Sequence, residues 1–259
     1  LISSLDGLKR SVPDAVFVAC TDDASQQRLW FLRKVSLGLI AGSRGDEKPV
    51  GMLEDMAVPP ESLCQFQQDI DALLGRHGLE ATWYAHASVG LLHIRPRMNL
   101  RDRANHDLLR TIGLEAVEIV RGYGGTVSGE HGDGRIRREM VNAFYGPELV
   151  EVFRRIKAIF DPAGMLNPGI IVGEPGPMQD LRLFPGGHPL GAEVEDTCFD
   201  WSQEGGLAAA SEACNGNGLC RRSGTGAMCP SYRATRDERH ATRGRGNALR
   251  LAITGQFVG

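Results

Sequence analysis

The stretch LEATWYAHASVGLLHIR, residues 79–95, is rich in β-branched and aromatic residues and predicts a β-strand. It carries two histidines, His86 and His93. Because their spacing of seven residues is odd, one unbroken strand would point the two imidazoles to opposite faces of a sheet. Gly90 lies between them and predicts a bulge or bend that inserts one residue and brings both imidazoles to the same side.

The segments on either side of this strand alternate between strand and helix. Further strands are predicted at Val16–Cys20 and Pro49–Val58, and helices at about 25–40, 63–74, 99–123 and 145–160. In the last helix the apolar residues at helical spacing are expected to face the core: Leu149, Val152, Phe153, Ile156 and Ile159. Single strands between helices predict the α+β class, in which helices cover a mostly antiparallel sheet.

A glycine-rich loop, SGEHGDGRIRR at Ser128–Arg138, places Glu130 and His131 side by side on backbone that can approach a ligand closely. A polar turn with an incidental histidine is the alternative interpretation. Two histidines with one carboxylate form the ligand set of an open, catalytic divalent-metal site, which predicts His86, His93 and Glu130 as metal ligands. Three protein ligands leave room for a substrate.

Composition excludes several classes of function. The chain has 259 residues, 42% of them hydrophobic, and 29 basic against 32 acidic residues, so its formal charge of −3 gives no reason to expect nucleic acid or an anionic membrane as the main partner. No apolar run is long enough to span a membrane, and the first 20 residues lack a secretory signal, so we expect a cytoplasmic protein. The opening residues resemble the middle of a helix, and we expect the chain to be a fragment.

Towards the carboxyl end the composition turns to proline and glycine, which predicts a linker over residues 173–200 between a domain at 1–172 and a small helical module at 201–259. Cys214, Cys220 and Cys229 cluster in this module. In a reducing compartment such a cluster indicates a metal or iron–sulfur site before a disulfide, with three reduced structural cysteines as the alternative.

Five stretches in register resemble one family: Trp30–Lys34, Gly45–Val50 with Glu54–Pro60, the His86/His93 pair, Gly129–Gly134 and Asp161–Gly169. Together they are similar to the C-terminal domain of FAD-linked oxidases of the vanillyl-alcohol-oxidase type. That family includes D-lactate, glycolate and D-2-hydroxyglutarate dehydrogenases. The resemblance covers residues 1–172 and implies a ferredoxin-like α+β domain.

The resemblance also implies a division of labour. FAD would be held mainly by an N-terminal domain outside this chain, while this domain caps the flavin ring and supplies the substrate pocket. The implied metal ligands, for Zn²⁺, Mn²⁺ or Fe²⁺, are His86, His93 and Glu130, and the implied general base for the substrate hydroxyl is His131. Contacts to the cofactor are implied for Glu130, Gly132 and Asn167.

Substrate recognition follows from the same resemblance. Arg33 and Lys48 are implied to bind the substrate carboxylate, with solvated surface charge as the alternative interpretation. Arg95, two residues after His93, adds a positive charge where some relatives have a neutral side chain. We therefore expect a dicarboxylate such as D-2-hydroxyglutarate, with D-lactate as the simpler candidate.

The tail resembles the start of a ferredoxin-type module fused behind the oxidase domain in large FAD and iron–sulfur enzymes, the YdiJ-type D-2-hydroxyglutarate dehydrogenases. It departs from a ferredoxin run because Asn217 occupies one cysteine position and Cys229 follows nine positions after Cys220. A fourth ligand would be Cys198 or a cysteine beyond Gly259. The expected location is the cytoplasm, with the periphery of the inner membrane as the alternative, and the electron acceptor is unidentified.

Two other functions fit the same residues. The ligands His86, His93 and Glu130 could hold zinc for a hydrolase with His131 as base. Alternatively, the chain is a non-catalytic electron-transfer or docking fragment built around its cysteines. Without a flavin domain we expect the isolated chain to be inactive.

Overall fold

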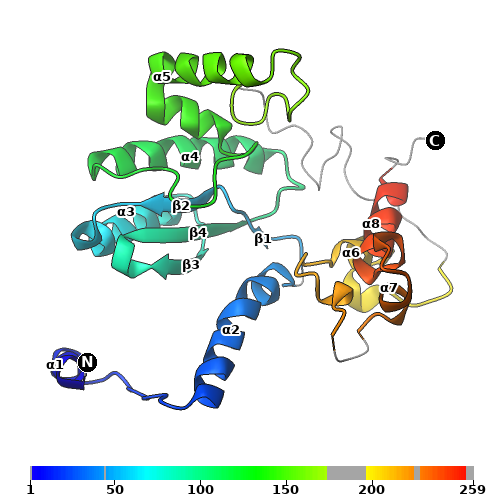
Figure 1. Ribbon diagram of the computed structural model, residues 1–259, viewed down its shortest axis with the longest axis horizontal. Helices are drawn as coiled ribbons and strands as arrows, with labels where there is room; N and C mark the ends of the chain where they lie inside the picture. Colours follow the sequence, from blue (N-terminus) through cyan, green and yellow to red (C-terminus); the bar gives the residue numbers. More distant parts are fainter. Residues whose placement is uncertain (1, 44, 174–196, 225–227, 255–259) are drawn as a thin grey trace. The chain divides into compact units, whose positions relative to one another are not determined.

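The computed structural model describes residues 2–43, 45–173, 197–224 and 228–254 (Figure 1). It divides into two compact units, Leu1–Ile40 and Ala41–Gly259, which are described separately. The first unit consists of helix α1 (Ile2–Ser11) and most of helix α2 (Asp23–Ala41), and α2 confirms the helix predicted near residues 25–40. Val16–Cys20 forms no strand, contrary to the sequence prediction. Val16 and Val18 are 90% and 77% exposed, and a strand without a hydrogen-bonded neighbour is not stable.

The second unit contains the sheet and the remaining helices. Its elements follow the order β1 (Lys48–Pro49), β2 (Leu53–Ala57), α3 (Leu63–Arg76), β3 (Ala81–His86), β4 (Leu91–Met98), α4 (Ala104–Gly122), α5 (Arg138–Phe160), α6 (Leu207–Glu212), α7 (Pro230–Thr235) and α8 (Thr242–Ile253). Strand β4 pairs antiparallel with β1, β2 and β3. Every pairing between these strands is antiparallel, so the predicted α+β class is confirmed.

The stretch that contains both histidines is a hairpin rather than one bent strand. A 3₁₀ turn at Ala87–Val89 ends in Gly90 with φ +70°, and the chain reverses there. Glycine is needed because a Cβ at this position would lie 1.8 Å from the carbonyl oxygen of Val58. The predicted bulge or bend at Gly90 was therefore wrong in form, because the reversal places His86 and His93 on adjacent strands.

The two faces of the sheet have different roles. One face carries Leu53, Met56, Leu92 and Ile94, which are buried against α3 and α4 in a single hydrophobic core. Figure 1 shows these two helices beside the strands, with α5 next to α4. In α4 the side chains of Leu109, Ile112 and Ala116 are fully buried. The opposite face of the sheet carries polar and aromatic side chains.

Helix α5 corrects a second prediction. It is longer than expected and bends at Gly146, whose φ/ψ of 74°/170° is non-helical, directly before Pro147. Leu149, Val152, Ile156 and Ile159 are between 45% and 74% exposed, although the periodicity predicted that they face the core. The periodicity correctly identifies an apolar stripe, but four of its five residues are exposed among the described residues.

The cysteine-containing part is helical, as predicted, and consists of α6, α7 and α8 with short 3₁₀ turns between them. An ion pair between Arg101 and Glu212 joins it to the loop after β4. Most of the predicted linker at 173–200, residues 174–196, lies outside the described residues. None of the described helices has the length and apolar character needed to cross a membrane.

Candidate active site

A row of side chains crosses the open face of the sheet. The strand register sets Glu54 of β2 opposite His93 of β4, and His93 opposite Tyr84 of β3. The ring of Tyr84 stacks on His93 with centroids 5.4 Å apart and an interplanar angle of 18°. His86 lies two residues after Tyr84, on the same face, with its ring 5.2 Å from that of His93. Because His86 and His93 lie on paired strands of a hairpin, both imidazoles reach the same face of the sheet despite their odd spacing in the sequence.

A bulge at Asp55 fixes the loop that faces this row. The register shifts between Glu54 and Met56, so Asp55 is the extra residue, and its φ of +79° is rare for a residue with a side chain. Its buried carboxylate accepts backbone N–H groups of Gly129, Glu130 and His131 at 2.9, 2.8 and 2.8 Å. Burial by itself would raise the pKa of Asp55, but these three donors hold it below its ordinary value.

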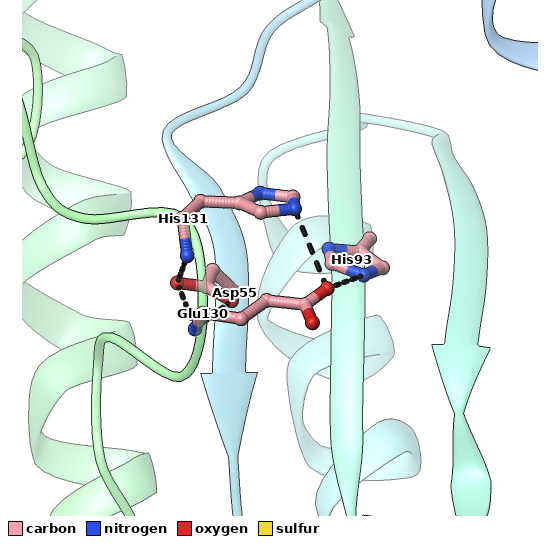
Figure 2. A group of neighbouring side chains, drawn as sticks. All are labelled: Asp55, His93, Glu130 and His131. Carbon is pink, nitrogen blue, oxygen red and sulfur yellow. Dashed lines mark hydrogen bonds and ion pairs between the residues drawn. The ribbon is translucent and has the colours of Figure 1, made fainter.

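The predicted ligands converge on one oxygen atom. Oε1 of Glu130 lies 3.1 Å from Nε2 of His86, 3.4 Å from Nε2 of His93 and 3.4 Å from Nε2 of His131. Figure 2 shows the carboxylate of Glu130 reaching from the loop towards the imidazoles of His93 and His131. Three nitrogens and one carboxylate, drawn from β3, β4 and the loop before α5, thus share one small volume.

Glu54 lies on the other side of two of these rings, and the sequence analysis gave it no role. Its Oε1 is 3.3 Å from Nδ1 of His131 and 3.8 Å from Nδ1 of His93, and Arg95 donates to the same oxygen at 2.5 Å. His93 is 6% exposed, and its Nδ1 is buried without a hydrogen-bond partner. Burial lowers the pKa of His93, and the neighbouring His131 lowers it further.

Arg137 is a second residue that sequence reasoning missed. Its guanidinium is buried and donates to the carbonyl oxygens of Glu54, Val127 and Gly132, which ties strand β2 to the glycine-rich loop. It also lies 3.6 Å from Asp55. The adjacent acids Glu54 and Asp55 within a buried strand were the available signal, because acids are rarely buried without a partner.

The donor set fits a divalent metal ion. Imidazole nitrogens with a carboxylate oxygen suit Zn²⁺, Mn²⁺ or Fe²⁺, and coordination needs the ligand atoms about 2.0–2.2 Å from the ion. Ligand atoms of Asp55, His93, Glu130 and His131 lie within 4.8 Å of one another. Both oxygens of Asp55 are occupied by backbone N–H groups. His93, Glu130 and His131 remain as donors of this group, and Nε2 of His86, 3.1 Å from Glu130, is a further candidate.

Lys48 lies apart from this cluster within the second unit. Lys48 pairs with Met98, five residues from His93 along β4, or about 17 Å at the rise of a strand, and it donates to the carbonyl oxygen of Ser43. Burial lowers the pKa of Lys48. Arg33 belongs to the first unit, where its guanidinium lies 5.6 Å from the ring of Trp30. The roles predicted for both residues remain untested by this geometry.

Two predicted cofactor contacts lie on left-handed backbone. Gly132 has φ +72° directly after His131, within the loop held by Arg137. Asn167 has φ +53° in a turn that Asp161 stabilises by accepting the N–H groups of Met165 and Leu166. Glycine and asparagine adopt this backbone conformation more readily than other residues.

The predicted iron–sulfur ligands are all free thiols. Cys214 and Cys220 are half-buried and Cys229 is buried, whereas Cys198 is exposed. Hydrogen bonds from the backbone of Tyr232 and from Thr242 lower the pKa of Cys229. A lowered thiol pKa favours the thiolate form that binds metals.

The fold and the site together define the class of protein. Residues 5–171 match the family described as FAD linked oxidases, C-terminal domain, and the chain belongs to this family. It is 35% identical over 235 residues to a D-2-hydroxyglutarate dehydrogenase of Escherichia coli (strain K12), a match that covers 89% of this chain and 22% of that protein.

More distant relatives carry related names. A D-lactate dehydrogenase of Archaeoglobus fulgidus is 31% identical over 155 residues, which are 60% of this chain and 32% of that protein. The glycolate oxidase subunit GlcD of Escherichia coli (strain K12) is 28% identical over 148 residues, which are 57% of this chain and 29% of that protein. The chain thus spans only 22% of the length of the D-2-hydroxyglutarate dehydrogenase with which it aligns over most of its own length.

Proposed function

We propose that this chain is the substrate-binding and acid–base part of a flavin-dependent dehydrogenase that oxidises a D-2-hydroxy acid. The observation that carries the proposal is the convergence of His86, His93 and His131 on one oxygen of Glu130. The relatives named D-2-hydroxyglutarate and D-lactate dehydrogenase support this class of substrate. The family match favours this function over a zinc-dependent hydrolase or a non-catalytic docking fragment.

In this proposal His86, His93 and Glu130 hold a divalent metal ion, and His131 acts as general base. A bound ion supplies Lewis acidity, and FAD supplies the two-electron acceptor for oxidation of the hydroxy acid to the oxo acid. His131 accepts the proton of the substrate hydroxyl at Nε2, the nitrogen that faces Glu130. The hydrogen bonds from the loop to Asp55 hold His131 in place for this step.

The open face of the sheet is proposed to face the flavin. Its row of Glu54, His93 and Tyr84 has no helix of the core over it, since α3 and α4 pack on the opposite face. Gly132 and Asn167 are proposed to contact the cofactor. FAD would be held mainly by an N-terminal domain of the complete protein, and the domain limits 1–172, 173–200 and 201–259 are part of this proposal.

Substrate selection is proposed to depend on Arg33, Lys48 and Arg95, whose cationic side chains suit a carboxylate. Arg95 lies nearest the histidines in the sheet, two residues from His93 on β4, and it has an ion pair with Glu54. A second carboxylate on the substrate would use the remaining donors of Arg95. The proposed substrate is therefore D-2-hydroxyglutarate, with D-lactate second.

Electrons are proposed to leave the flavin through an iron–sulfur cluster bound by Cys214, Cys220 and Cys229, with a fourth ligand elsewhere in the complete protein. The lowered pKa of Cys229 supports thiolate ligation. The acceptor beyond the cluster is unassigned, and a cytoplasmic location at the periphery of the inner membrane is proposed. The visible spectrum of iron–sulfur in the full-length protein should be lost in C229S and retained in C64S, since Cys64 is an exposed thiol of α3.

The test of the function uses the full-length protein with a redox dye. We expect it to oxidise D-2-hydroxyglutarate faster than D-lactate. The variant H131N should lower kcat by about 10²–10⁴-fold, the usual contribution of a general base. The control variant H77N alters the histidine that directly follows α3 and should leave kcat unchanged. Full activity of H131N, or no oxidation of any 2-hydroxy acid by the wild type, would refute the proposal.

A further inference from the structure

We propose that Glu54, anchored by Arg95, is a positioning residue that sets the orientation and tautomer of both His93 and His131. This inference rests on the proposed function, because it assigns a purpose to the two imidazoles. Glu54 reaches both rings from the Nδ1 side, at 3.8 Å for His93 and 3.3 Å for His131. Both Nε2 atoms face Glu130 instead, at 3.4 Å.

The chemistry of imidazole explains why such a residue is needed. A neutral imidazole carries one N–H and one lone pair, and a metal ligand or general base must present the lone pair. If Nε2 of His93 presents its lone pair to an ion that it shares with Glu130, and Nε2 of His131 presents its lone pair to the substrate hydroxyl, the proton of each ring lies on Nδ1. A buried N–H requires an acceptor, and the buried Nδ1 of His93 makes no hydrogen bond; the carboxylate that approaches it is that of Glu54, at 3.8 Å.

Arg95 makes Glu54 suitable for this role. The Glu54 side chain is only 14% exposed, and its Oε1 accepts Nη2 of Arg95 at 2.5 Å. The arginine compensates the buried negative charge and fixes the carboxylate on the side of the sheet where the histidines lie. Arg95, Glu54 and the two imidazoles thus form a connected set that spans β2, β4 and the loop before α5.

Strand geometry places Glu54 there for a local reason. The bulge at Asp55 allows Leu53 and Met56 to face the core while Glu54 and Asp55 lie on the site side. Adjacent acids therefore take different tasks. Asp55 holds the backbone of the loop, and Glu54 holds the rings that the loop and β4 present.

The test compares E54A and E54Q with E115Q in the full-length protein. E115Q is the control, because it also removes the charge of a glutamate that pairs with an arginine. Glu115 of α4 lies 2.9 Å from Arg76 of α3. For E54A we expect the dissociation constant for Mn²⁺ to rise about 10–100-fold, as for other residues that orient metal-bound histidines. At saturating Mn²⁺ we expect kcat for D-2-hydroxyglutarate to fall about 10–100-fold with KM within threefold of wild type.

E54Q keeps an oxygen acceptor at this position. On a logarithmic scale, its changes in the Mn²⁺ dissociation constant and in kcat should be at most two thirds of those of E54A. E115Q should match wild type in both. A crystal structure of E54A should show the His131 ring rotated away from Glu130. Unchanged Mn²⁺ affinity and kcat in E54A would overturn the inference, as would unrotated rings. If the wild type oxidises no 2-hydroxy acid, the proposed function fails, but Mn²⁺ affinity and ring orientation still decide the role of Glu54.

Discussion

Replacing Asp55 with asparagine tests how the loop that carries Glu130 and His131 is held. Asparagine has the same shape and tolerates positive φ as well as aspartate, so D55N isolates the loss of the charge at a φ of +79°. The carboxylate accepts three backbone N–H groups, and Arg137 lies 3.6 Å away. The side-chain NH₂ of asparagine would face some of these backbone N–H groups, and two donors cannot form a hydrogen bond with each other.

The expected cost follows from these contacts. A hydrogen bond to an ionised acceptor contributes about 1.5–3 kcal/mol, and a neutral one about 1 kcal/mol. Losing one such bond and weakening two others amounts to about 3 kcal/mol for local opening of the loop. At 1.36 kcal/mol for each factor of ten, amide exchange of residues 129–131 should accelerate about 10²-fold.

Hydrogen exchange measured by mass spectrometry on the peptide covering residues 126–137 of the full-length protein gives this quantity directly. D69N serves as the control, because Asp69 accepts a hydrogen bond from Tyr123 on the helical side of the domain. The control should leave exchange of this peptide unchanged. Exchange in D55N within threefold of wild type would refute the role assigned to Asp55.

Two further substitutions test the fold around the site. G90A should destabilise the domain by about 3 kcal/mol, because alanine disfavours φ +70° and its Cβ would clash with Val58, whereas G75A in open space on α3 should stabilise by up to about 1 kcal/mol. Equal unfolding temperatures for the two variants would contradict this. The hydrogen bond from Lys157 is the main cause that lowers the pKa of Asp161 in the folded protein. The ionised Asp161 therefore stabilises the fold above the pKa of the unfolded chain, near 3.8, and this stabilisation is lost as the pH falls through the lower pKa of the folded state. D161N should therefore unfold at lower temperature than wild type at pH 7, with the gap closing as pH falls from about 5 to about 2; a pH-independent gap would be inconsistent with this cause.

Local patterns in the sequence were sufficient to predict the main helices of the domain and the types of residue that gather at the site. Helices α3 and α4 were predicted because apolar periodicity is a property of each segment alone. The glycines around Glu130 and His131 likewise indicated a loop that could approach a ligand. The class of fold followed from the order of these segments.

Features that depend on strand pairing could not be predicted in the same way. The turn at Ala87–Val89 lacks the usual asparagine–glycine signal, so residues 79–95 read as one strand. The bulge at Asp55 exists only relative to the register of β4, and the role of Glu54 depends on that bulge. The apolar stripe of α5 was identified, but periodicity within one segment does not show whether another element packs on it, and most of the stripe is exposed.

The central claim is that His86, His93 and Glu130 hold one divalent ion. The direct measurement is the content of Zn, Mn and Fe in the full-length protein by mass spectrometry, with the same preparation of H93N, of E130Q and of the control H77N, whose histidine is half-buried and pairs with Glu115. A stoichiometric ion in wild type and H77N that is missing from H93N and E130Q is the expected result. Equal metal content in all four proteins would contradict the account.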